Sequence, residues 1–459
     1  MMKLYKSIIQ QVLLLFLLTY LWSCKKYLDE SPDKSLVIPT KFNELQGILD
    51  LNSMYINYPW AGELANDNIY FSYTDWASIT NVNDQNTYIW NPNTDLSQSW
   101  TLTYARILNA NIVLSVIDKL QDNTATIADR NAVKGGALFY RAYNFYELAQ
   151  LFSPAYSVSS MNLPLGIPLK LSADAEDVTK RSTVAETYNQ IIRDLKMAIP
   201  LLPAYQSVAT NRTRACQAAA FGLLARTYLS MSDYENAGTY ADSCLRLYNT
   251  LIDYNNSSLV NSTANVPFQK FNGEVIFHAV SYQVNATKSK VDSTLYSWYD
   301  SNDIRKKAFF MTITDGGFRF KGNYNGTSYS LPFCGIATDE VYLVRAECYA
   351  RQGKVSEAMN DLNKLLNTRW LSNKFIPITT SDPQQALAII LRERRKELCF
   401  RPSLRWTDIR RLNLSGDNSI TITRNLNGRI YTLLPNDLTY TFLIPNVVID
   451  MSGIEQNPR

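Results

Sequence analysis

Two stretches of the chain concentrate aromatic side chains beside amides and carboxylates. Residues 70–100 mix Tyr and Trp with Asn and Asp, and residues 290–300 add further rings. Aromatic faces stack on flat, C–H-rich groups such as sugar rings, while amides and carboxylates pair with hydroxyl groups. The residues expected to bind a ligand in this way are Tyr73, Trp76, Trp90, Tyr296 and Trp298 as a stacking platform, with Asn81, Asn83 and Asp84 as hydrogen-bonding partners.

Each of these rings also has a structural interpretation, because long loops use aromatic residues as core anchors. Residues 70–100 show little periodicity, and their Asn and Asp residues favour turns, so an irregular loop platform is predicted. Trp100 opens a helical pattern and is expected in the core. Asp67 stands close to a glycine turn and is expected to have a structural role.

Patterns typical of catalysis are weak in this chain. His278 is the only histidine and lies in an apolar, strand-like run, so a buried core histidine is favoured over a catalytic base. Nothing singles out a glycosidase pair among the 41 acidic residues. The sequence shows no phosphate-binding loop, dinucleotide fingerprint or metal-ligand spacing. We therefore predict a protein that is not an enzyme and that needs no cofactor or metal.

The stretch Leu391–Leu412 carries eight Lys and Arg residues in 22 positions. A nucleic-acid patch, a solvated helix face and a structural lattice of ion pairs are three interpretations of it. Acidic residues interrupt the basic ones, and the spacings Glu393–Lys396 and Arg394–Glu397 suit pairing along a helix. The lattice is favoured because planar guanidinium groups pair well with carboxylates. A formal net charge of only +4 also argues against a nucleic-acid partner.

A helix is expected to lead into this stretch. Asp382 can cap its first turn, and Pro383 suits the first helical position. Pro402 prevents continuation much past Arg401. The apolar residues of the helix keep a 3.6-residue period, so one face is expected in the core, with Trp406 helping to lock the segment in place.

The N-terminus has the features of a secretory signal peptide. Lys3 and Lys6 precede an apolar run at residues 8–21, which is shorter than a membrane-spanning helix. The run ends in Leu21-Trp22-Ser23-Cys24, which resembles a bacterial lipobox, so Cys24 is expected to carry acyl chains that hold the protein on a membrane. The predicted divisions are a signal peptide at 1–23, a lipid-anchored tether at 24–40 and a single domain at 41–459.

An internal repeat indicates the scaffold. Phe221, Ala225, Tyr228 and Ala237 recur as Tyr342, Ala346, Tyr349 and Ala358 with the same intervals. Each set spans a short turn and places small residues where two helices cross, as in tetratricopeptide repeats. The predicted fold class is mainly α: a tetratricopeptide-like helical-repeat scaffold with loop-rich insertions and a few short strands. Helix pairs are expected near 99–152, 183–250 and 337–401, insertions near 70–100 and 255–330, and strands near 274–282, 430–434 and 440–444.

The cysteines beyond Cys24 number five and include no closely spaced pair. This pattern is typical of neither a disulfide framework nor a zinc site. Four of them fall in helical patterns where small apolar residues pack, so core positions are favoured. A bridge between Cys216 and Cys244 is an open alternative.

Several motifs along nearly the whole chain carry a family resemblance. They are the lipobox at Cys24, Gly62-Glu63-Leu64 with Asp67-Asn68, Trp100–Ile117, Asp339–Gly353, Arg392–Arg411, Ile444-Pro445 and Gln456-Asn457-Pro458. In their order and spacing the sequence resembles the SusD/RagB family of Bacteroidetes outer-membrane lipoproteins. It departs at Arg401-Pro402-Ser403-Leu404, where the family commonly has an acidic residue and Gly-His before Arg-Trp.

The resemblance implies a SusD-like, cell-surface glycan-binding lipoprotein of the outer membrane that faces the cell exterior. Such a protein captures oligosaccharides as the lid of a SusC-like TonB-dependent transporter, and its tetratricopeptide helices face that transporter. Binding of peptides or of another non-glycan nutrient is one alternative. A protein-binding scaffold without its own ligand site is the other. The implied partners are the transporter, an oligosaccharide and the membrane through the lipid anchor, without nucleic acid.

Overall fold

The computed structural model describes residues 39–122, 124–174, 177, 179–282, 285–328, 330–416 and 419–459. The chain divides into residues 1–40 and a compact unit of residues 41–459, to which every element below belongs. The signal peptide and Cys24 lie outside the described residues, as does the tether apart from Pro39 and Thr40.

The described residues are mainly helical, with 17 α-helices and four pairs of short strands. The helices are α2 (Phe42–Asp50), α3 (Asn52–Tyr55), α4 (Ala61–Ala65), α5 (Tyr73–Ala77), α6 (Val82–Tyr88), α7 (Ser97–Val116), α8 (Ile127–Phe152), α9 (Val184–Ala198), α10 (Gln217–Ser230), α11 (Tyr234–Leu247), α12 (Ser293–Ser297), α13 (Arg305–Phe309), α14 (Thr338–Arg351), α15 (Val355–Asn367), α16 (Pro383–Glu397), α17 (Leu404–Ser415) and α18 (Asn446–Ser452). None of them combines the length and apolar character that crossing a membrane requires.

The strands form four separate antiparallel pairs and no larger sheet among the described residues. Their bounds are β1 (Ile69–Tyr70) with β3 (Lys290–Val291), β2 (Val275–Phe277) with β6 (Ile336–Ala337), β4 (Phe310–Thr312) with β5 (Phe318–Phe320), and β7 (Ile422–Leu426) with β8 (Arg429–Leu433). Each pair fastens an insertion or a terminal segment rather than forming a layer of its own.

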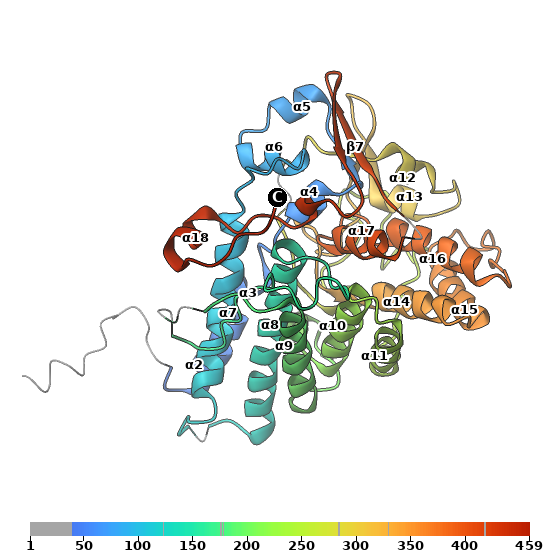
Figure 1. Ribbon diagram of the computed structural model, residues 1–459. Helices are drawn as coiled ribbons and strands as arrows, with labels where there is room; N and C mark the ends of the chain where they lie inside the picture. The colour runs from blue at the N-terminus through green and yellow to red at the C-terminus, as the bar shows by residue number, and fades with distance from the viewer. Residues whose placement is uncertain are drawn as a thin grey trace, which may run out of the picture. The chain divides into compact units, whose positions relative to one another are not determined.

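Seven helices form an array in which each packs beside the next (Figure 1). Helices α7 to α11 follow one another in the chain, and α14 and α15 continue the array after the insertion that holds α12 and α13. Helix α16 packs against α14 and α15, and α17 packs against α4. The predicted fold class, mainly α with tetratricopeptide-like helix pairs, is confirmed.

The two copies of the sequence repeat form the pairs α10–α11 and α14–α15. Each pair turns through one residue with a positive φ at the matching repeat position, Ser232 at 60° and Gly353 at 75°. The two turns therefore use the same left-handed step, although only one of them has the glycine that favours it. The alanines of the repeat are buried in both pairs: Ala225, Ala237, Ala346 and Ala358.

Two local predictions are wrong. Residues 70–100 are not an irregular platform, because α5 and α6 form there; Ser72 and Asn81 cap these helices by accepting backbone N–H groups of Asp75 and Asn83. Residues 440–444 contain no strand, since Tyr440 closes a 3₁₀ turn.

The predicted core positions of the cysteines are confirmed. Cys216, Cys244 and the other three described cysteines are buried free thiols. The alternative of a Cys216–Cys244 bridge is therefore wrong.

Candidate functional site

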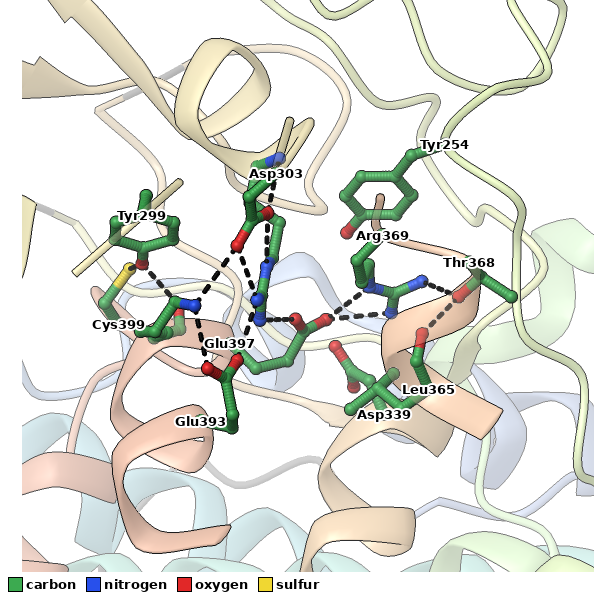
Figure 2. A network of polar contacts seen from close by, with 12 residues as sticks. Tyr254, Tyr299, Asp303, Asp339, Leu365, Thr368, Arg369, Glu393, Glu397 and Cys399 are labelled. Carbon is green, nitrogen blue, oxygen red and sulfur yellow. Dashed lines mark hydrogen bonds and ion pairs between the residues drawn. The ribbon is translucent and has the colours of Figure 1, made fainter. Parts of the chain in front are cut away.

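The basic stretch forms the end of α16 and most of α17, and most of its residues are buried. Figure 2 shows Glu393 and Glu397 of this stretch in a network of polar contacts that includes Asp303 and Arg369. Arg369 donates to both carboxylate oxygens of Glu274 at 2.9 Å and to Oε1 of Glu397 at 2.8 Å. Arg305 donates to Oε2 of the same Glu397 at 2.9 Å and to Glu393 at 2.7 Å. Helix α16 is thereby tied to α13, to the end of α15 and to the start of β2. The predicted ion-pair lattice is confirmed.

The partners within the lattice differ in part from the predicted ones. Lys396 lies 2.8 Å from Glu393, as its spacing on the helix predicts. Arg394 does not pair with Glu397; its Nε donates to Asp408 of α17 at 2.8 Å. Both oxygens of Glu397 accept instead from Arg305 and Arg369, which reach it from other elements of the fold.

Three buried carboxylates of this lattice, Glu274, Asp339 and Glu397, have oxygens within 4.8 Å of one another. Each already pairs with an arginine: Glu274 and Glu397 with Arg369, and Asp339 with Arg401. A metal ion would compete with these guanidinium groups for the same oxygens. We therefore interpret the cluster as structural.

The loop after α4 is held against α16 and α17 through Asp67. Arg405 donates to both oxygens of Asp67 at 2.7 Å, and Nη2 of Arg395 lies 3.3 Å from the same carboxylate. Burial alone would raise the pKa of Asp67, but the guanidinium groups of Arg405 and Arg395 outweigh burial and hold this pKa well below its usual value. The structural role expected of Asp67 is confirmed.

Glu63 of α4 is buried with neutral partners, which gives the protein a predicted pH dependence. Asn66 and Asn68 donate to its two carboxylate oxygens at 2.8 and 2.9 Å. Burial raises the pKa of Glu63 from 4.5 to about 7, because these amide bonds offset only part of the desolvation. Between these two pH values the folded state binds more protons than the unfolded chain, so this group makes stability fall as pH rises.

We therefore expect the free energy of unfolding of Glu63→Gln, relative to wild type, to rise between pH 4.5 and 7. The contribution of one proton to the slope is at most about 1.4 kcal/mol per pH unit. Urea unfolding across this range measures it, with the exposed Glu235→Gln as control. Parallel stability curves for Glu63→Gln and wild type would contradict the assignment.

The predicted platform aromatics differ in exposure and in the groups that surround them. Tyr73 and Trp76 lie together on α5 with ring centroids 6.2 Å apart, and Tyr73 is exposed. The indole N–H of Trp76 donates to the Gln85 carbonyl at 3.2 Å, so this ring clasps α5 to α6. Tyr296 stacks on Phe318 with centroids 3.5 Å apart. One face of Tyr296 is therefore covered by the protein itself.

Two of the predicted tryptophans are occupied by contacts within the protein. Trp298 is half-buried beside α16, with the guanidinium of Arg395 5.1 Å from its ring centroid. Trp90 is only 7% exposed, and its indole N–H donates to the Ala65 carbonyl at 2.9 Å. The guanidinium of Arg424 also lies over the Trp90 ring. Trp90 is therefore a core anchor and leaves the candidate platform.

The three predicted hydrogen-bonding residues, by contrast, line one surface groove of about 410 Å³. We call it the amide groove. Asn81, Asn83 and Asp84 stand at the start of α6, and the start of α7 also lines the groove. The remaining lining residues are Asn57, Tyr58, Pro59, Trp60, Ala61, Leu64, Thr87, Asp95, Leu96, Ser97, Gln98, Ser99, Leu102 and Tyr282.

The polar groups of the groove offer both donors and acceptors. The side-chain oxygen of Asn81 accepts the Asn83 N–H at 3.0 Å, and that of Asn83 accepts the Asp95 N–H at 3.1 Å. Their oxygens fix the loop, while their NH₂ groups have no partner among the described residues. Burial raises the pKa of Asp84 to about 6, and Asn285 donates to it at 3.4 Å. The groove thus presents amide donors beside carboxylate acceptors.

Tyr282 is the exposed aromatic residue of the groove, and sequence reasoning missed it. Tyr282 as a residue is 55% exposed, whereas Tyr58 and Trp60 in the same groove are buried. It ends the run that was interpreted as a strand, and its residue type was the only signal that marked it. No spacing along the sequence connects it to Asn81.

His278 lies in the core between Phe271 and Phe333, with ring centroids 4.8 and 5.9 Å away. Burial, helped by the nearby charge of Lys270, lowers its pKa to about 3. A base with such a pKa is poorly matched to proton transfer near neutral pH. The groove therefore offers binding groups without a histidine base.

Two family models match the chain in succession and leave only short segments uncovered. One, described as starch-binding and associating with the outer membrane, matches residues 26–229, and the SusD family model matches residues 232–431. This chain belongs to the SusD/RagB family. The family assignment agrees with the resemblance that the sequence motifs carry.

Individual relatives of this SusD family member are distant in sequence and close in fold. SusD-like protein P2 of Formosa agariphila is 25% identical over 74% of this chain and 77% of its own length. A SusD superfamily structure from Bacteroides thetaiotaomicron has a TM-score of 0.72 at 21% identity, covering 91% of this chain and 100% of that one. Surface glycan-binding protein A from Bacteroides uniformis has a TM-score of 0.68 at 16% identity, covering 90% and 99%.

Proposed function

We propose that this SusD family protein is a cell-surface lipoprotein that binds oligosaccharides in the amide groove. It delivers them to a SusC-like TonB-dependent transporter of the outer membrane, which its tetratricopeptide-like helices face. The observation that carries the proposal is the convergence of Asn81, Asn83 and Asp84 with the exposed ring of Tyr282 in one groove. The family description as starch-binding and associating with the outer membrane supports the ligand class and the location.

The chemistry of the groove suits a sugar chain. Tyr282 offers an apolar face for a sugar ring, and the Asn81 and Asn83 NH₂ groups donate to hydroxyl oxygens. Asp84 and Asp95 accept hydroxyl protons. The volume of about 410 Å³ falls within the usual range of small-ligand sites, about 300–1,000 Å³. In this proposal the groove holds the ligand and does not cleave it.

We expect Tyr282→Ala to weaken glycan binding about tenfold or more, because the ligand loses the apolar area that it buries against the ring. Calorimetric titration with a panel of soluble glycans measures the dissociation constants, and the chain length of the recovered glycan reports any hydrolysis. Tyr205→Ala is the matched control, since Tyr205 is 48% exposed and lies outside the groove lining.

Tyr73→Ala tests the rival location on α5, because Tyr73 is as exposed as Tyr205. Loss of binding in Tyr73→Ala with normal binding in Tyr282→Ala would move the site from the groove to α5. Binding of a peptide panel without any glycan binding would favour the alternative of peptide capture. A protein that binds the transporter and neither panel would be a scaffold without its own ligand site.

The lipid anchor is a second proposal, which rests on the lipobox that ends at Cys24. Acyl chains contribute about 0.8 kcal/mol per buried methylene, so several chains hold a protein stably on a membrane. We expect Cys24→Ala to move the protein from the membrane fraction to the soluble fraction. Ser31→Ala, in the same tether segment, controls for the substitution. Retention of Cys24→Ala in membranes at the wild-type level would refute the anchor.

A further inference from the structure

Arg410 of α17 is a buried cation without a carboxylate partner. Arg410 is only 4% exposed, and no described acidic group forms an ion pair with it. Nη1 and Nη2 each donate to a backbone carbonyl at the C-terminal end of α8, those of Gln150 and Ser153. Burial without a counter-charge lowers the pKa of Arg410. The helix end supplies about half a negative charge, which offsets only part of a full positive one.

Arg424 shows how carbonyl groups alone satisfy a buried guanidinium in this protein. Its Nε, Nη1 and Nη2 all donate, to the carbonyls of Tyr88, Ile69 and Asn66. In Arg410, by contrast, Nε has no partner. Arg410 therefore lacks both a counter-charge and a complete set of acceptors, and buried polar groups in this condition call for a missing partner.

Arg410 also borders a surface hollow of about 160 Å³, which we call the α17 hollow. Hydroxyl groups gather in its walls. Ser157 Oγ lies 3.0 Å from the Oγ atoms of both Ser159 and Ser160 in the loop after α8. Tyr440 Oη accepts the side-chain N–H of Asn413 at 3.3 Å, which leaves the Tyr440 proton without an acceptor among the described residues.

Ser157 Oγ donates to Ser160 Oγ at 3.0 Å, and Ser160 Oγ donates to the Ala155 carbonyl at 2.6 Å, so these protons are already used. The Tyr440 hydroxyl is left as a donor at the α17 hollow. The acidic lining residue of the hollow is Asp437, whose Oδ1 is engaged by the N–H and the hydroxyl of Thr439 at 2.8 and 2.7 Å. A cation without a counter-charge at the wall, together with the Tyr440 hydroxyl, suits an oxyanion, whose negative charge offsets that of the guanidinium and whose oxygens accept hydrogen bonds.

We propose that the α17 hollow binds an oxyanion group, the carboxylate or sulfate of an acidic sugar. Arg410 supplies the counter-charge, and the Tyr440 hydroxyl donates a hydrogen bond. The hollow is large enough for the charged group with at most one small ring. The identity of the ligand as a sugar rests on the proposed glycan-binding function. Binding of the oxyanion group itself does not depend on that function.

The α17 hollow lies at the same end of the α7–α8 pair as the amide groove. Trp100, in the first turn of α7, contacts Phe152, the last residue of α8, with ring centroids 5.0 Å apart. Ser99 lines the groove, and Pro154 lines the hollow. This placement suits a ligand that carries an acidic substituent on a neutral chain.

Thermal-shift titrations of the full chain test the proposal at constant ionic strength, with sodium chloride as the balancing salt. The probes are sodium glucuronate, sodium acetate, sodium sulfate and neutral glucose. A concentration-dependent rise in Tm with glucuronate, and none with glucose, is expected. A response to acetate or sulfate equal to that of glucuronate means that the group alone is recognised, whereas a stronger response to glucuronate means that its ring is also bound. Absence of any anion response, or an equal response to glucose, overturns the proposal.

Variants of residues in the α17 hollow test whether the change in Tm with anions arises there. Tyr440→Phe is expected to raise the apparent dissociation constant for the anion about tenfold, the usual effect of losing one hydrogen bond to a charged group. Asp437→Asn is expected to lower this dissociation constant several-fold, because it removes a negative charge from the wall of the hollow. Asp300→Asn is the matched control, because Asp300 likewise accepts a backbone N–H two residues ahead, from Asn302 at 2.7 Å, and lies outside the hollow lining.

Equal effects of Asp437→Asn and Asp300→Asn would show a general charge effect and would overturn the site. Arg410→Gln is expected to abolish the response; if it fails to fold, Tyr440→Phe and Asp437→Asn still decide. Tyr282→Ala is expected to leave the acetate response unchanged. Loss of neutral-glycan binding with retained acetate binding therefore separates failure of the groove from failure of the hollow.

Discussion

Arg369→Met is expected to lower the free energy of unfolding by about 3–5 kcal/mol, the range seen when one partner of a buried ion pair is removed. Arg369 bonds Glu274 and Glu397 at 2.8–2.9 Å, and all three side chains are fully buried. Methionine keeps much of the side-chain volume of Arg369, so the loss of stability measures mainly the removal of the positive charge. Arg305 still neutralises Glu397 in the variant, but Glu274 loses its arginine. Urea unfolding at pH 8 measures the change.

The matched control is Arg246→Met, which removes an equally close ion pair from the surface. Arg246 lies 2.8 Å from Asp242, but its side chain is 79% exposed, so a loss below about 1 kcal/mol is expected. The double variant Arg369→Met with Glu274→Gln is expected to recover part of the loss, because it no longer buries an unpaired charge. Strictly additive losses would show that the charge of Glu274 is not what Arg369 stabilises.

The scaffold was predictable because its signals are local. The intervals of Phe221, Ala225, Tyr228 and Ala237 match those of the second repeat, and small residues at fixed spacings are what two crossing helices require. The ion-pair lattice of the basic stretch was predictable from its interleaved charges, but its burial was not, because the same pattern also suits a solvated helix face. The individual partners were not, because spacing along a helix identifies Lys396–Glu393 but cannot show that Arg369 and Arg305 take Glu397 from Arg394.

The candidate site was predictable only where its residues are neighbours in the sequence. Asn81, Asn83 and Asp84 share the start of α6 and therefore line one groove. The roles of the aromatic residues were harder to predict, because the sequence alone does not distinguish a ring in the core from a ring on a binding surface. Trp90 turns inward to bond Ala65, while Tyr282 reaches the groove from a distant segment through tertiary contacts alone.

Arg395→Glu is expected to cost at least about 3 kcal/mol of stability, or to abolish soluble yield, because it reverses a charge inside the lattice. Nη2 of Arg395 donates to the Asp67 carbonyl at 2.7 Å and lies 3.3 and 3.4 Å from the carboxylates of Asp67 and Asp292. A glutamate there brings a third carboxylate to two existing ones, and like charges about 4 Å apart at an effective dielectric constant of 20 repel by about 4 kcal/mol. Thermal and urea unfolding measure the loss.

Arg392→Glu makes the same charge change one turn earlier on α16, at an exposed position beside Trp298, and is expected to change stability by less than about 1 kcal/mol. The comparison isolates burial from charge, since helix, residue type and net charge change are shared. Because Arg395 acts through the Asp67 loop and not on the ligand, any folded Arg395→Glu protein should bind glycan close to normally. Normal stability with lost glycan binding would instead make Arg395 part of the ligand site. The basic stretch would then have a role in binding as well as in the scaffold.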